Sequence, residues 1–196
     1  MHSRKRLGFT LIEVMISLTM LGVIMGAVVS TMTSMQRGYI RQREVARTED
    51  ALRVAELTIT RILQAGASNP LNIPVPAAVT AGPRIDPLVA PFDTVRVYAD
   101  YNPVDGDMAD LLEDVQVWAL NDTLFVRWQA GAAAAPLAFP VRSLLFQYDS
   151  AGTVLTNPTI IRRAATRVQV TLTAPRHSRT TVLARRDTWV YLRNRK

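Results

Sequence analysis

An apolar run that carries a single charge constrains this chain more than any other feature. The run extends from Phe9 to Ser30, its one charged residue is Glu13, and a short basic leader precedes it at residues 4–6. About 20 apolar residues are enough to cross a bilayer as a helix. A carboxylate inside such a helix costs about 2.5–3.5 kcal/mol and usually marks a function with a partner. We therefore expect a membrane-spanning helix in which Glu13 has a specific role.

Two simpler interpretations of this run are a secretory signal and a plain membrane anchor. An ordinary secretory signal would close with a small-residue cleavage site after a shorter apolar core, and no A-x-A pattern closes this run. A plain membrane anchor has no need of a carboxylate near its start, although Glu13 could snorkel or face the positive end of the helix dipole. The basic leader predicts a cytoplasmic amino terminus, so the rest of the chain would be translocated.

The segment Gly8-Phe9-Thr10-Leu11-Ile12-Glu13, in register with the basic leader and the apolar run, resembles the class III signal of type IV pilins and type II secretion pseudopilins. The resemblance implies that a prepilin peptidase cleaves after Gly8 and that the new amino-terminal residue, Phe9, is N-methylated. It also implies that Glu13 meets the amino terminus of a neighbouring subunit in a filament. The implied partners are other pilin or pseudopilin subunits, the peptidase and an inner-membrane assembly platform. The implied location is the bacterial inner membrane, crossed once, with the carboxyl-terminal domain exported to the periplasm or the cell surface.

Beyond this segment, the chain is similar to the larger minor subunits of these systems, namely J-type pseudopilins and W-type minor pilins. The helical stretch 51–66 and the closing strand 190–194 carry that resemblance. The K-type pseudopilin lacks the membrane glutamate, so Glu13 argues against that role. The resemblance therefore implies a non-enzymatic minor subunit that primes or caps a type IV pilus or a type II secretion pseudopilus.

The helix is expected to continue past the membrane as far as Gly66. Apolar or neutral residues recur at spacings of three and four, which is the stripe of an amphipathic helix: Val45, Thr48, Leu52, Ala55, Ile59 and Ile62. Gly66 suits a C-cap, and Pro70 prevents the helix from resuming. Within the membrane part, Gly22 and Gly26 form a GxxxG pair that could serve close helix packing or helix flexibility.

The rest of the chain has the pattern of an antiparallel β domain. Prolines crowd residues 70–91, after which alternating apolar residues predict strands at 94–99, 115–120, 123–129, 141–148, 166–173 and 181–193. Asn121-Asp122 is a two-residue hairpin signal, and 130–135 is expected to be a loop. The predicted fold class is α+β, with a long amino-terminal helix packed on an antiparallel sheet. The expected divisions are a leader at 1–8, a membrane or filament-core helix at 9–33, an amphipathic continuation at 34–66, a proline-rich connection at 67–93 and a β domain at 94–196.

The residue inventory disfavours an enzyme and a cofactor. The chain has no cysteine, so it lacks both a disulfide and a thiol nucleophile. His177 is the one histidine outside the leader, and no P-loop or zinc-ligand spacing is present. A membrane-anchored exported enzyme that works with carboxylates alone is kept as a less favoured alternative.

Charge is distributed unevenly along the chain. Residues 66–140 hold three basic and nine acidic groups, whereas residues 141–196 hold eleven basic and two acidic groups. The acidic middle could bind calcium through Asp105, Asp107 and Asp110, although the spacing does not match an EF-hand. The basic end could contact the acidic middle of a neighbouring subunit, or bind DNA as a minor pilin of an uptake pilus.

The basic residues proposed for such a surface are Arg162, Arg163, Arg176, Arg179, Arg185 and Arg186. Subunit contact is the favoured interpretation, since positive charge alone is weak evidence for nucleic acid. Exposed ion pairs contribute about 0–1 kcal/mol each. We therefore expect that reversing Arg185 and Arg186 together weakens partner binding and leaves the fold intact.

Overall fold

The computed structural model describes residues 10–66, 85–86, 92–98, 113–175 and 183–192. The chain divides into two compact units, Met1–Arg43 and Glu44–Lys196, and each is described by itself. Helix α1 (Leu11–Ala65) supplies the described part of the first unit and the first element of the second.

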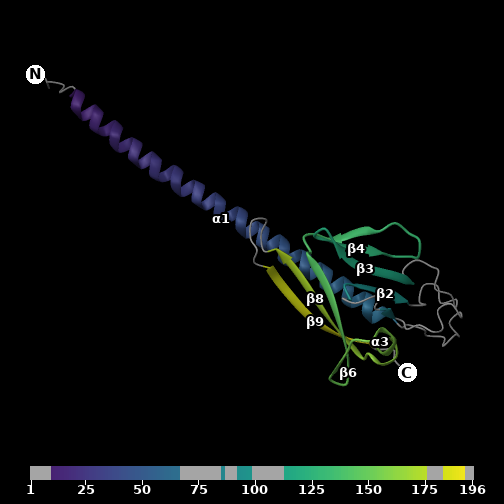
Figure 1. Ribbon diagram of the computed structural model, residues 1–196. Coiled ribbons are helices and arrows are strands. Elements are labelled where there is room, and N and C mark those ends of the chain that lie inside the picture. The colour runs from purple at the N-terminus through teal and green to yellow at the C-terminus, as the bar shows by residue number, and fades with distance from the viewer. Residues whose placement is uncertain (1–9, 67–84, 87–91, 99–112, 176–182, 193–196) are drawn as a thin grey trace, which may run out of the picture. The chain divides into compact units, whose positions relative to one another are not determined.

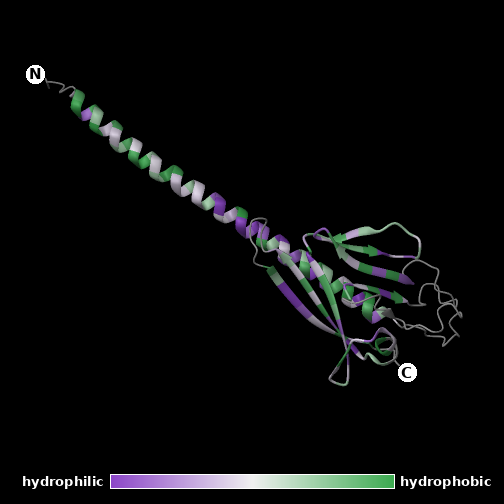
Figure 2. Ribbon diagram, viewed as in Figure 1, coloured by the Kyte–Doolittle hydropathy of each residue, from purple (hydrophilic) through white to green (hydrophobic). Residues whose placement is uncertain are grey.

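The α1 residues of the first unit form an apolar helix. Figure 2 shows the hydrophobic residues along this part of the helix, which is long and apolar enough to cross a membrane. Its hydroxyl side chains are hydrogen-bonded to the helix backbone: Ser17 Oγ donates to the Glu13 carbonyl at 2.8 Å, and Thr31 Oγ1 donates to the Ala27 carbonyl at 2.9 Å. Such internal bonds suit a helix in lipid, where water is absent.

The second unit places two antiparallel sheets against the carboxyl-terminal part of α1 (Figure 1). The five-stranded sheet has the order β1 (Ile85–Asp86), β2 (Thr94–Tyr98), β3 (Asp114–Leu120), β4 (Thr123–Arg127) and β5 (Ala135–Ala138). The four-stranded sheet has the order β7 (Thr153–Leu155), β6 (Ser143–Ser150), β8 (Arg167–Pro175) and β9 (Leu183–Tyr191), and the short helix α3 (Pro158–Ala164) connects β7 to β8. The Phe146 N–H donates to the Phe92 carbonyl at 2.9 Å, which joins β6 to the residues that precede β2.

One hydrophobic core lies between the helix and the sheets. Strand alternation sends every second side chain of β2, β4, β6 and β8 inward. The helix contributes the buried side chains of its stripe: Leu52, Ala55, Ile59, Ile62 and Leu63. The largest buried rings, Phe146 and Tyr148, come from β6, and the ring of Phe92 meets Tyr148 edge-on with centroids 5.8 Å apart.

The predicted fold class is confirmed: a long amino-terminal helix precedes antiparallel β-sheets in an α+β fold. The predicted hairpin is also present, since Asn121 and Asp122 adopt φ values of 50° and 56° between β3 and β4. These are the left-handed conformations that a two-residue hairpin turn needs. Several findings differ from the expectation, and they include the strands β1 and β7, which were not predicted. The strands form two sheets rather than one, β5 begins at Ala135 where a loop was expected, and α3 was not predicted.

Candidate functional site

The amino-terminal turn of α1 holds Glu13 close to the start of the helix. The Thr10 carbonyl accepts hydrogen bonds from the N–H groups of Glu13 and Val14, at 3.1 and 3.2 Å, and the Thr10 hydroxyl lies 3.4 Å from the Glu13 nitrogen. Thr10 is therefore the N-cap, and Glu13 stands at the third position of the first turn. This is the T-x-x-E arrangement of a capping box, in which a carboxylate is favoured at the positive end of the helix.

Thr10 is a residue that the sequence reasoning did not single out. The signal was visible, because a threonine followed three residues later by a glutamate and then by an apolar run is a known helix start. The cap fixes where the helix begins and so determines where the Glu13 side chain stands on it. Gly8 and Phe9, the predicted cleavage and methylation residues, lie outside the described residues.

Gly22 and Gly26 lie one turn apart in α1, and neither is required by the chain's own packing. A Cβ atom placed on either glycine would meet no other atom within 4 Å. Both positions also have ordinary helical backbone, since the described positive-φ glycines are Gly131 and Gly152. The fold of a single chain therefore supplies no reason for glycine at these positions.

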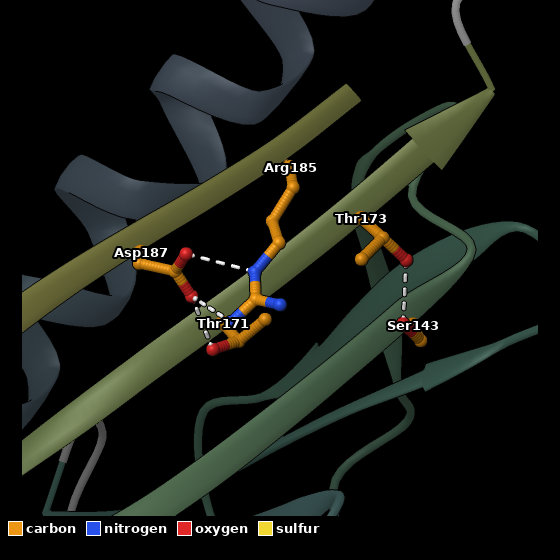
Figure 3. A network of polar contacts seen from close by, with 5 residues as sticks. All are labelled: Ser143, Thr171, Thr173, Arg185 and Asp187. Atoms are coloured by element: carbon orange, nitrogen blue, oxygen red, sulfur yellow. Dashed lines mark hydrogen bonds and ion pairs between the residues drawn. The ribbon is translucent and has the colours of Figure 1, made fainter. Parts of the chain in front are cut away.

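Two predicted basic residues, Arg185 and Arg186, are adjacent in β9 but point to opposite faces of the sheet. Arg185 is on the outward face, where it binds Asp187 through two bonds of 2.8 and 3.0 Å, and Thr171 donates to the same carboxylate at 2.6 Å (Figure 3). The hydrogen bond from Arg185, followed by that from Thr171, lowers the pKa of Asp187 below its usual value. Ser143 and Thr173 form a second polar contact beside this pair, at 2.5 Å (Figure 3).

Arg186 points inward and joins β9 to the helix. Its Nη1 and the Thr188 hydroxyl both donate to the Glu56 carboxylate on α1. Burial raises the pKa of Glu56, but the hydrogen bonds from Thr188 and Arg186 outweigh burial and hold that pKa below its usual value. The expectation that reversing Arg185 and Arg186 together spares the fold stays a prediction. The contact of Arg186 counts against it, because the charge of Arg186 balances a carboxylate within the domain.

One further arginine of the carboxyl-terminal region, Arg167, is also paired with a carboxylate of the domain. Arg167 Nε lies 2.7 Å from Asp149, and its guanidinium stands over the Trp189 ring at 4.5 Å. This pairing reduces the positive charge that the region could offer to phosphates, which weakens the DNA interpretation. Arg162 and Arg163 belong to α3, but their side chains lie outside the described residues, as do Arg176, Arg179, Asp105, Asp107 and Asp110. Within the described ranges, no group of three or more His, Asp or Glu side chains is placed to hold a metal ion.

Comparison with protein families gives a match at the amino-terminal end of the chain. Residues 3–29 match the family described as prokaryotic N-terminal methylation motif. The matched range contains the basic leader, Gly8, Phe9, Glu13 and both glycines of α1. A search of curated proteins found no match. The amino-terminal end of this chain is therefore similar to a prepilin-type methylation motif, and it is followed by a long helix and antiparallel sheets.

Proposed function

We propose that this chain is a minor subunit that primes or caps a filament, either a type II secretion pseudopilus or a type IV pilus. The observation that carries the proposal is the methylation motif at 3–29, in register with an apolar helix whose capped first turn holds Glu13. The work of such a subunit is assembly, and the covalent chemistry belongs to the peptidase that processes it.

Processing is proposed at the bond between Gly8 and Phe9. Gly8 has no side chain, so a peptidase can approach its backbone closely. The mature chain would begin at Phe9 with one methyl group on its amine. Glu13 would then lie in the first helical turn of the processed chain, where its carboxylate can pair with the amine of Phe9 on a neighbouring subunit. Such pairing compensates a charge that is costly in lipid.

The experiment that tests processing is intact-mass analysis of the protein extracted from membranes of its native host. The expected mass is that of residues 9–196 plus one methyl group. Gly8→Val should leave residues 1–8 attached and block assembly, whereas Ser3→Val, which introduces the same side chain away from the bond, should be processed normally. A mature chain that starts at another residue would refute the proposed site.

The experiment that tests assembly separates insertion from incorporation. Glu13→Ala removes the cost of the buried carboxylate but leaves the partner amine unpaired. We expect this variant to insert and to be cleaved as the parent is, and to be cross-linked into filaments much less. Incorporation equal to the parent would show that Glu13 is only tolerated in the helix. Binding of duplex DNA by the parent in a gel at low salt would support the DNA-uptake alternative, in which the chain is still a filament subunit.

A further inference from the structure

The apolar stripe of α1 does not by itself determine the axial position of the helix relative to the sheets. Its buried members recur every three or four residues: Leu52, Ala55, Ile59, Ile62 and Leu63. A shift of the helix by one turn would move it about 5.4 Å along its axis. That shift carries Ala55 to the place of Ile59, and Ile59 to the place of Leu63, so these two side chains still have apolar neighbours. The same shift carries Leu52 to the place of Glu56, where the neighbours are polar.

The polar contacts between α1 and the four-stranded sheet do not repeat in this way. The first is the Glu56 cluster, which consists of Glu56, Arg186 and Thr188. Arg186 and Thr188 are two positions apart in β9, so both side chains project from the same face of the strand. Each donates to a different oxygen of the Glu56 carboxylate. The side chains are partly enclosed, with exposed fractions of 23% for Glu56 and 40% for Arg186.

A second polar contact lies eight residues earlier in the helix, about 12 Å away along its axis. The Thr48 hydroxyl donates to the carbonyl of Pro175, the last residue of β8, at 3.1 Å. Thr48 is buried, with 3% of its surface exposed. Because β8 and β9 are paired strands, the Glu56 cluster and the Thr48 contact hold the helix to one stiff β-ribbon at separate points.

We propose that the Glu56 cluster, aided by Thr48, sets the register of α1 against the sheet, so that the helix has one axial position among several that the apolar stripe would accept. A one-turn shift would leave the Glu56 carboxylate partly enclosed without its two donors, which is the costly case for a polar group. Polar groups that select one register from a degenerate apolar seam are known in helical assemblies. The inference rests on the contacts within Glu44–Lys196 and does not depend on the proposed function.

Register matters in this chain because α1 is continuous from Leu11 to Ala65. Any axial pull on the amino-terminal part of the helix is transmitted along the hydrogen-bonded backbone toward the domain. Apolar contacts resist sliding weakly, since they exchange for similar contacts one turn away. The Glu56 cluster opposes sliding directly, because its hydrogen bonds must break before the helix can move.

The experiment is a distance measurement between two spin labels on the full chain in detergent micelles. The chain has no cysteine, so Leu57→Cys on the helix and Gln147→Cys on β6 place the labels uniquely. Both positions are exposed and lie outside the Glu56 cluster. The labelled parent should give one narrow distance distribution. Arg186→Met, and the double variant Glu56→Met with Arg186→Met, should broaden the distribution or add a population displaced by up to about 5 Å.

Matched controls separate register from stability. Arg185→Met removes the neighbouring ion pair on the outward face, and we expect its distance distribution to equal that of the parent. The double variant replaces both charges with apolar side chains of similar length, which is often neutral for stability, and tryptophan fluorescence verifies that the domain remains folded. If the folded double variant keeps the single narrow distribution of the parent, the apolar stripe alone sets the register and the proposal is overturned. If Arg186→Met alone unfolds the domain, the distance distribution of the folded double variant is the measurement that tests the proposal.

Discussion

The helix residues 44–65 are a structural part of the β domain, and one pair of substitutions tests this directly. Leu52 and Leu57 lie on the same helix, but Leu52 is 0% exposed in the core whereas Leu57 is 50% exposed. Replacing each with alanine changes helix propensity equally, so that effect cancels in the comparison. The difference between the two variants therefore measures what burial of the helix contributes to the domain.

The magnitude follows from burial. Truncating a fully buried leucine to alanine costs about 2–5 kcal/mol, because apolar contact is lost and a cavity remains. For a domain of this size each kcal/mol lowers the Tm by about 2–4 °C, so a loss near 3 kcal/mol corresponds to about 6–12 °C. Leu57→Ala is a surface change and should stay within about 0.5 kcal/mol of the parent.

The assay is thermal unfolding of the full chain in detergent, followed by tryptophan fluorescence. All three tryptophans, Trp118, Trp128 and Trp189, belong to residues 44–196, so the signal reports on the domain and not on the membrane part of the helix. Equal Tm values for Leu52→Ala and Leu57→Ala would refute the reasoning. That result would mean that the sheets fold without the helix stripe as part of their core.

Three further predictions follow from local contacts. The hydrogen bond from Arg167 holds the pKa of Asp149 below its ordinary value of about 3.9. The stabilisation from the ionised carboxylate is therefore complete above that pH and is lost as the pH falls through the lowered pKa. Asp149→Asn should flatten the fall of Tm in acid, and it should not raise the Tm at neutral pH above that of the parent. Gly152 has a φ of 90° in the turn between β6 and β7, so Gly152→Ala should cost about 1–2 kcal/mol in a urea titration, and a midpoint equal to the parent's would contradict the turn geometry. Gly26→Ala should stabilise the isolated helix by about 1 kcal/mol; reduced incorporation into filaments despite that gain would favour a packing or flexibility role for the glycine, and unchanged incorporation would refute it.

Much of the fold could be predicted because its elements are marked locally. The stripe from Thr48 to Ile62 has the period of a helix, and Asn121-Asp122 identifies the β3–β4 hairpin from two residues. By contrast, β5 consists of Ala-Pro-Leu-Ala, which has little intrinsic strand preference and is paired only because β4 lies beside it. Helix α3 did carry a signal that was overlooked: Asn157 caps it by accepting from the Thr159 N–H at 2.9 Å, and Pro158 occupies its first turn.

The candidate site likewise has one part that the sequence reveals and one part that it does not. Residues of the methylation motif are contiguous, so the sequence displays Gly8, Phe9 and Glu13 together. The contact between Glu56 and Arg186 joins residues 130 positions apart, and nothing in the local pattern of either residue indicates the other. Strand alternation could have shown that Arg185 and Arg186 face opposite ways, but which of them faces the helix depends on the pairing of β9 with β8.

The long separation between Glu56 and Arg186 also determines when the domain can be completed during synthesis. At about 5–20 residues per second, the ribosome needs about 7–26 s to make the 130 positions between them. Through that interval the helix stripe has no β9 to cover it, and Glu56 has neither donor. Local helix formation takes less than about a microsecond, so the helix can form long before the last described strand of its domain has been synthesised. Synthesis of the last described strand is therefore slower than formation of the first helix.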